Sequence, residues 1–221
     1  MADQTDDALI REVNDELREE QMKKLWQRYG GFVVGVAVLI VAIVAGYQGW
    51  KHYDVTTRSS EGEQFHTALQ LAETGNSAEA LNAMRTLSGD ASSGYGVLAQ
   101  FQEAALLADQ GDASGAAALY QQIARANVGN VALSGLANVL GLLIEVNAGG
   151  YDRAALEFRL STIAEDGHPY RHSARELLGV IALDAGDTEK ARAAFAQVAE
   201  DATAPKGLRD RAKSLLQRLG S

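Results

Sequence analysis

One stretch decides the fold: Gly186-Asp187-Thr188-Glu189-Lys190-Ala191-Arg192-Ala193-Ala194-Phe195. Its glycine is followed by alanine after five positions and by a large apolar residue after nine. The same spacing occurs four times, with the glycines 36, 38 and 37 residues apart. A fixed period of this length indicates a repeat protein. The repeat-defining residues are Gly75, Ala80, Met84, Gly111, Ala116, Tyr120, Gly149, Ala154, Phe158, Gly186, Ala191 and Phe195.

Each of these glycines lies between two apolar stretches with helical periodicity, such as Leu177 to Ala185 and Ala191 to Val198. Glycine supplies the positive φ at which a helix ends. Alanine lets the second helix approach the first, and the large residue fills the space between neighbouring hairpins. Because one hairpin cannot bury its own apolar face, hairpins stack. We therefore predict an all-α solenoid of about four helical hairpins over residues 61–221, closed by a helix from Lys206 to Leu219.

A second feature is the uncharged stretch 29–50, which lies between Arg28 and Lys51. As a helix its 22 residues would be about 33 Å long, enough to cross a bilayer. Tyr29 borders one end and Trp50 the other, as expected at membrane interfaces. A cleaved signal peptide would need a shorter apolar region and a basic rather than an acidic leader. We therefore predict an uncleaved transmembrane helix.

The basic residues predict the orientation of this helix. Arg18, Lys23, Lys24 and Arg28 precede it, whereas only Lys51 and Arg58 follow it closely. The positive-inside rule then places the N-terminus in the cytoplasm. We expect a charged cytoplasmic tail (1–28), the membrane span (29–50), a juxtamembrane linker (51–60) and a periplasmic repeat domain (61–221) of a bacterial inner-membrane protein. The tail stripe Ile10, Val13 and Leu17 leaves open whether the tail docks on a partner or is only solvated.

Small residues recur along one face of the expected membrane helix. Gly31 and Gly35, and Ala42 and Gly46, form small-xxx-small pairs, and Gly49 continues them. Such pairs let helix backbones approach closely in lipid, although glycine is also common in membrane helices generally. We expect this transmembrane packing face to contact another helix of unspecified identity.

Composition and motifs argue against nucleic-acid binding, metal binding and catalysis. The net charge is −9 without a long basic run, which disfavours nucleic-acid binding, and the chain has no cysteine. His168 and His172 have the helical spacing of a metal pair, but no third ligand stands at a defined spacing and Pro169 predicts a helix start between them. No phosphate-binding or nucleophile motif occurs. We therefore expect no catalytic residues, metal, cofactor or small-molecule substrate.

The repeat columns resemble the tetratricopeptide repeat, best at Gly111-Asp112 and Gly186-Asp187. Gly179 falls where that repeat has its first-helix glycine. The first helices depart from the pattern at one column. The position expected to hold a bulky core residue carries Gln64, Gln100, Asn138 and Arg175. The position after it carries Phe65, Phe101, Val139 and Glu176. We therefore expect the first helices to be shifted by one residue or rotated.

The whole layout resembles the YfgM-type ancillary subunit of the bacterial Sec translocon. Ser93-Gly94-Tyr95-Gly96-Val97-Leu98-Ala99 is similar to a Tyr-Gly-x-Leu-Ala segment of that family. The tail from Glu12 through Leu25 to Gly30 resembles that of an alphaproteobacterial branch of the family. The resemblance implies association with translocon subunits and with a periplasmic folding factor of the PpiD kind. It also implies a role near emerging, newly translocated proteins.

Three functions are compatible with these observations. The first is a membrane-anchored protein-interaction module at the translocon, where anchoring raises the effective concentration of the repeat domain. The second is a repeat scaffold for envelope or cell-division machinery. The third is an enzyme with a site in the repeat groove, for which the sequence offers no cluster of candidate residues.

Overall fold

The computed structural model describes residues 3–220, with side chains described for residues 22–24, 26–32 and 34–220. All regular secondary structure in this part of the chain is α-helix, which confirms the predicted all-α class. The tail stripe Ile10, Val13 and Leu17 lies outside the described side chains. The helices are α1 (Asp3–Glu73), α2 (Ser77–Asp90), α3 (Gly94–Asp109), α4 (Ala113–Ala126), α5 (Val131–Ala148), α6 (Arg153–Ile163), α7 (Arg171–Asp184), α8 (Thr188–Glu200) and α9 (Lys206–Leu219).

The chain divides into two units, Met1–Ser59 and Ser60–Ser221, and α1 runs from the first into the second. The first unit contains the apolar stretch, whose large side chains are exposed: Ile40 is 53% and Val41 67% accessible. From Met22 onward, α1 is long and apolar enough to cross a membrane, and 6% of its most apolar window is buried. The same test selects α5, which instead packs within the second unit against α4 and α7.

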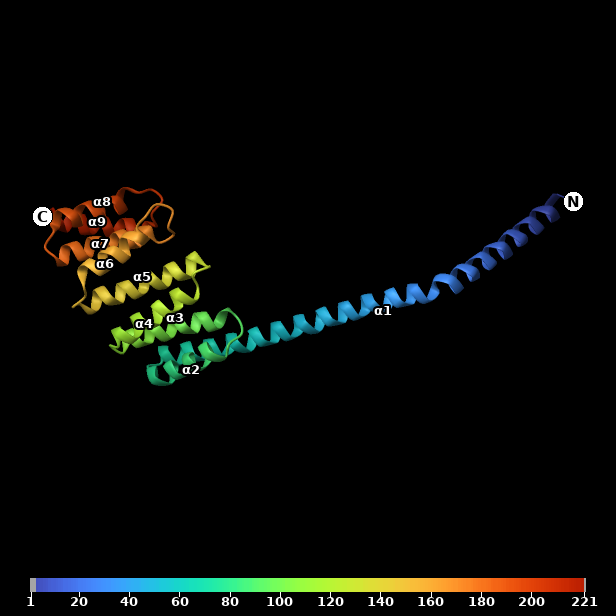
Figure 1. Ribbon diagram of the computed structural model, residues 1–221, viewed down its shortest axis with the longest axis horizontal. Helices are drawn as coiled ribbons and strands as arrows, with labels where there is room; N and C mark the ends of the chain where they lie inside the picture. Colours follow the sequence, from blue (N-terminus) through green and yellow to red (C-terminus); the bar gives the residue numbers. More distant parts are fainter. Residues whose placement is uncertain (1–2, 221) are drawn as a thin grey trace. The chain divides into compact units, whose positions relative to one another are not determined.

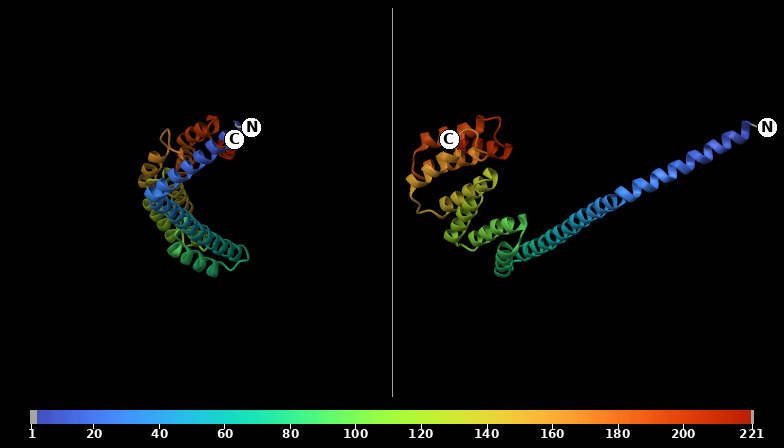
Figure 2. Two further views of the ribbon diagram at one scale, coloured as in Figure 1. Left: turned by 90° about the vertical axis from the view of Figure 1, so that its right-hand side faces the viewer. Right: turned by 45° about the vertical axis from the view of Figure 1, so that its right-hand side comes forward.

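The second unit, the repeat unit, is a series of antiparallel helix pairs. The end of α1 pairs with α2, α3 with α4, and α7 with α8, while α9 packs on α8 and α7 (Figure 1 and Figure 2). Successive pairs share apolar clusters; one joins Leu142, Leu160 and Ile181 from α5, α6 and α7. The predicted solenoid of about four hairpins with a closing helix is therefore confirmed.

Local chemistry explains the turns between paired helices. Gly75, Gly111, Gly149 and Gly186 all adopt positive φ, from 74° to 86°. After three of them the next residue donates its N–H to a carbonyl five positions back, as Asp187 does to Ala182 at 2.8 Å. This is the Schellman closure of a helix. The side chains of Asp112, Asp152 and Asp187 then accept a backbone N–H three residues on and cap the second helices.

In the third turn the helix cap lies three residues after the glycine, whereas in the other turns it lies one residue after it, and this corrects the predicted repeat columns. Its cap is Asp152, preceded by Gly149, Gly150 and Tyr151, and Gly150 also has positive φ. Counted from the caps, the columns at four and eight positions contain Ala80, Ala116, Leu156 and Ala191, and Met84, Tyr120, Leu160 and Phe195. All eight residues are buried. By contrast Ala154 is exposed and Phe158 is 73% accessible, so these two residues are not core positions of their repeat.

Close helix approaches occur where the first helices carry glycine. A Cβ added to Gly179 of α7 would lie 2.5 Å from Cε1 of Phe195 on α8. A Cβ on Gly141 of α5 would lie 3.1 Å from Cβ of Tyr120 on α4. The Phe195 ring therefore packs directly on the backbone at Gly179, and the Cβ of Tyr120 packs on the backbone at Gly141. A larger residue at either glycine would crowd these contacts.

Candidate protein-interaction surfaces

The irregular third hairpin separates α6 from its partner helix. Where the other hairpins have alanine at the close-approach position, α6 has Leu156, which is 2% accessible. The bulkier side chain and the longer turn keep α6 away from α5, so α5 packs mainly on α4 and α6 mainly on α7. This displacement opens a cleft that regular stacking would close.

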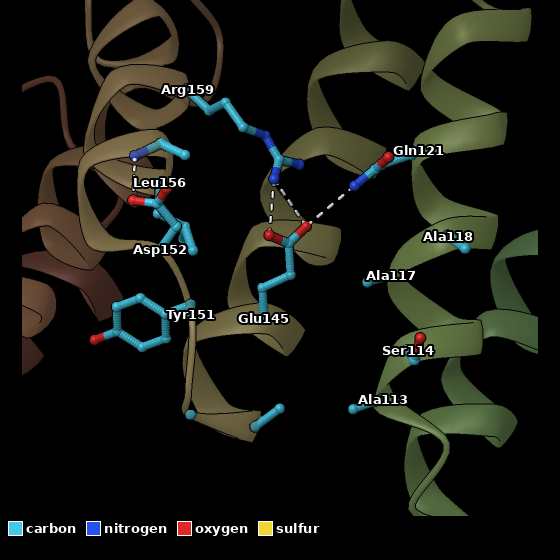
Figure 3. Close-up of a pocket in the computed structure, with 13 residues that line it drawn as sticks. Ala113, Ser114, Ala117, Ala118, Gln121, Glu145, Tyr151, Asp152, Leu156 and Arg159 are labelled. Atoms are coloured by element: carbon cyan, nitrogen blue, oxygen red, sulfur yellow. Dashed lines mark hydrogen bonds and ion pairs between the residues drawn. The ribbon is translucent and has the colours of Figure 1, made fainter.

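The α4–α6 cleft has a volume of about 480 Å³. Its walls are mostly small side chains, and Figure 3 shows those of α4 facing α6 across the cleft. Small residues leave room for another backbone or side chain to approach closely. The cleft is lined by Ala113, Ser114, Ala117, Ala118, Gln121, Glu145, Ala148, Gly149, Tyr151, Asp152, Ala155, Leu156 and Arg159.

A polar network closes one end of this cleft. Arg159 of α6 donates from Nη1 to both carboxylate oxygens of Glu145 on α5, at 2.9 and 2.7 Å. Gln121 of α4 donates to the same carboxylate at 3.2 Å, and Figure 3 shows Glu145 between these two side chains. Because the charge of Glu145 is compensated and hydrogen-bonded, the network links three helices rather than offering a free acid or base.

A second concave surface is the first-helix groove, formed by α5, α7 and α9. Two adjoining depressions of about 610 and 230 Å³ share Leu143, Glu176, Leu177 and Arg211. Most of the lining is aliphatic, and α5 contributes a half-buried stripe of Leu136, Leu140 and Leu143. The groove is lined by Leu136, Val139, Leu140, Leu143, Tyr170, Ser173, Glu176, Leu177, Val180, Arg211, Ser214, Leu215 and Arg218.

An ion pair stands between the two depressions of the groove. Arg211 of α9 donates from Nε and from Nη2 to the carboxylate of Glu176 on α7, the second bond measuring 2.6 Å. Glu176 is 8% accessible, and its hydrogen bonds raise the pKa of the Arg211 guanidinium above its ordinary value. In the sequence, Glu176 stood out as a charged residue in the column that otherwise holds Phe65, Phe101 and Val139. The spacing of the repeats could not identify its partner Arg211, which lies 35 residues further along the chain.

The two histidines with metal-like spacing do not converge on a common point. His168 accepts the N–H of Tyr170 at Nδ1 and packs beside Gly135. His172 is 4% accessible, and its Nε2 lies 3.3 Å from Oγ1 of Thr203. Among the described residues no group of three His, Cys, Asp or Glu side chains could hold a metal ion.

The predicted transmembrane packing face lies on α1. At 100° per residue, Gly31, Gly35, Ala42, Gly46 and Gly49 fall within one narrow arc of the helix. A Cβ built on any of the four glycines would contact nothing within 4 Å, and Ala42 is exposed. Within the described part of the chain, no other side chain covers this face.

Stacked antiparallel helix pairs with glycine turns and concave surfaces define the class of helical-repeat proteins. A family model described as a tetratricopeptide repeat-like domain matches residues 23–220, so the chain belongs to that family. Such domains act as protein-interaction scaffolds. No curated protein and no solved structure matches the chain at a significant level.

Proposed function

We propose that the protein is a membrane-anchored protein-interaction module that acts by binding rather than by catalysis. In this proposal residues 29–50 span the bacterial inner membrane with residues 1–28 in the cytoplasm. Residues 51–60 link the span to a periplasmic repeat domain over residues 61–221. The exposed apolar side chains of α1 support the anchor, because water would solvate them poorly.

The observation that carries the binding role is the first-helix groove. Leu136, Leu140 and Leu143 leave apolar surface partly open along one side of α5. Burying such surface contributes about 25 cal/mol per Å², so a groove of this kind stabilises a complex with a partner of matching shape. Anchoring confines this groove near the membrane, where the partner's effective concentration is high.

The proposed partners are subunits of the Sec translocon and a periplasmic folding factor of the PpiD kind. This finer assignment rests on the resemblance of the layout and of Ser93 to Ala99 to that ancillary subunit. Under this assignment the transmembrane packing face around Gly35 contacts a helix of the translocon. The first-helix groove binds a periplasmic protein that handles translocated chains.

Photo-crosslinking in intact membranes tests the proposal. A photoreactive amino acid at Leu140 or Ser214 samples the groove, and one at Ala42 samples the membrane face. The matched control is Gln122, an exposed residue of α4 that lines neither concave surface. Groove-specific capture of a periplasmic folding factor, together with translocon subunits at Ala42, would support the proposal. Equal products at Leu140 and Gln122 would refute the groove as the binding surface.

A further inference from the structure

Phe158 is a large apolar side chain of α6 that faces solvent, with 73% of its surface accessible. The other large apolar residues of this helix, Leu156, Leu160 and Ile163, are buried. At 100° per residue Phe158 lies on the opposite side of α6 from them. The ring therefore projects outward from the repeat unit.

A stripe of uncharged side chains surrounds Phe158 on the outer face of α6. Its members are exposed and fall within an arc of about 120° of the helix. Arg153 and Glu157 lie beyond the edge of this arc and pair with each other at 3.7 Å. The outer stripe consists of Ala154, Ala155, Phe158, Ser161 and Thr162.

The outer stripe borders the α4–α6 cleft, because Ala155 belongs to both. The cleft has a volume of about 480 Å³, whereas an apolar cavity of about 150 Å³ already holds benzene. Its α4 wall includes Ala118, which Figure 3 shows facing the cleft. The charged residues of its lining are Asp152, which caps α6, and the ion pair Glu145–Arg159. The cleft is therefore a recess of small side chains that is large enough for a phenyl ring.

We propose that two copies of this chain pair through this surface, with Phe158 of each copy inserted into the α4–α6 cleft of the other. A two-fold interface requires a projection and its matching recess on the same surface of each copy. The outer stripe and the adjoining cleft supply both. This inference goes beyond the proposed function, because the cleft shares no residue with the first-helix groove.

Charge and shape favour a second copy over an unrelated partner. Each chain has a net charge of −9, so two copies repel each other over most approaches. An uncharged stripe beside a nearly neutral cleft minimises this repulsion, and burial of the ring adds apolar attraction. An unrelated protein would need its own projection for the cleft and its own recess for Phe158. A second copy supplies both by symmetry.

Energy transfer between donor-labelled and acceptor-labelled full chains in detergent micelles measures the pairing. Phe158→Ala removes the projection, and we expect it to weaken pairing at least about a hundredfold because two rings leave the interface. The matched control is Val128→Ala, in the connection between α4 and α5. Val128 is 74% accessible and lines neither concave surface, so its loss should change pairing less than about twofold.

A second pair of variants fills the recess instead of removing the projection. Ala118→Phe places a ring in the cleft of its own copy and should weaken pairing as Phe158→Ala does. Gln122→Phe is the control, because Gln122 is also exposed on α4 but does not line the cleft. It should pair like the unmodified chain.

Mixing the two disabling variants tests the reciprocal geometry. Neither variant can form a contact with itself, but Phe158 of the Ala118→Phe copy still fits the open cleft of the Phe158→Ala copy. The mixed pair therefore retains one of the two contacts. We expect it to form at least about tenfold more tightly than either variant pairs with itself.

Photo-crosslinking locates the contact independently of affinity. Benzoylphenylalanine at position 158 keeps an aromatic projection, and in membranes with two differently tagged copies its product should map to residues 113–121 of the other copy. The same probe at position 128 should give no such product. Unchanged pairing in Phe158→Ala, an equal loss in Val128→Ala, or a mixed pair no tighter than either variant alone would overturn the inference. So would an unmodified chain that stays monomeric, or a crosslink from position 158 to another protein instead.

Discussion

His172 is a buried base with one unmatched nitrogen. Among the described residues its Nδ1 has no hydrogen-bond partner, and it lies 3.7 Å from Oδ2 of Asp201, in the connection between α8 and α9. Burial, and then the nearby charge of Arg171, lower the pKa of His172 below its ordinary value of 6.5, although Asp201 opposes them. The folded protein therefore holds this imidazole neutral, whereas the unfolded chain protonates it more readily.

The sign of the resulting pH dependence follows from linkage. Because the unfolded state binds the proton first, the free energy of unfolding should fall as pH drops below about 6.5 and level off below the folded-state pKa. One such histidine contributes at most about 1.4 kcal/mol per pH unit. His168, whose pKa burial also lowers, acts in the same direction.

We predict that His172→Gln reduces this acid sensitivity without abolishing it. Urea unfolding of the full chain in detergent at pH 7 and pH 5 measures the difference. His66→Gln, at an exposed position of α1, is the control. An unchanged difference in His172→Gln would show that this imidazole does not titrate as its surroundings imply.

Gly179 shows how a single missing side chain sets a helix distance. An added methyl group would overlap the Phe195 ring of α8, so we predict that Gly179→Ala destabilises the repeat unit by about 1–3 kcal/mol. Gly89→Ala, in α2 where a Cβ would contact nothing within 4 Å, should instead be neutral or stabilise by up to about 1 kcal/mol. Thermal unfolding followed by circular dichroism compares the two variants.

At the scale of one element, α6 illustrates how an inserted pair of residues changes a repeat. The longer turn moves every side chain of α6 by two positions relative to the other second helices, which buries Leu160 and exposes Phe158. We predict that Leu160→Ala costs about 2–5 kcal/mol of stability, whereas Phe158→Ala costs less than about 1 kcal/mol. If Phe158→Ala destabilised the protein more than Leu160→Ala, Phe158 rather than Leu160 would be the core residue of the third repeat.

The membrane face of α1 yields a second prediction at this scale. If Gly35 contacts a partner helix, Gly35→Leu should reduce the yield of membrane-embedded crosslinks from Ala42 several-fold by blocking close backbone approach. Ala37 lies on the opposite side of α1 and is also small, so Ala37→Leu is the matched control. Equal yields in the two variants would argue against a small-residue contact.

For the molecule as a whole, the proposed topology can be tested because the chain has no native cysteine. In intact spheroplasts, a membrane-impermeant maleimide should label Ser114→Cys in the repeat unit but not Asn14→Cys in the tail. Both should react after membrane disruption. The reverse pattern would invert the orientation that the basic residues predict.

Turn chemistry and helix periodicity allowed the sequence alone to determine the helical class, the hairpins and their approximate boundaries. Positive-φ glycines and aspartate caps act over three to five residues, so their effect can be read locally. Even so, the equal spacing of Gly149 with the other glycines concealed the longer turn, because the extra residues come after the glycine.

Only the tertiary structure decided which surfaces are concave. The displacement of α6 depends on how Leu156 packs between helices, and the α4–α6 cleft follows from that displacement. The pair Glu176–Arg211 joins residues 35 positions apart, and Glu145–Arg159 joins two helices that otherwise touch little. Such contacts depend on the angles and distances between whole helices, which arise from packing many side chains together and leave no local pattern in the sequence.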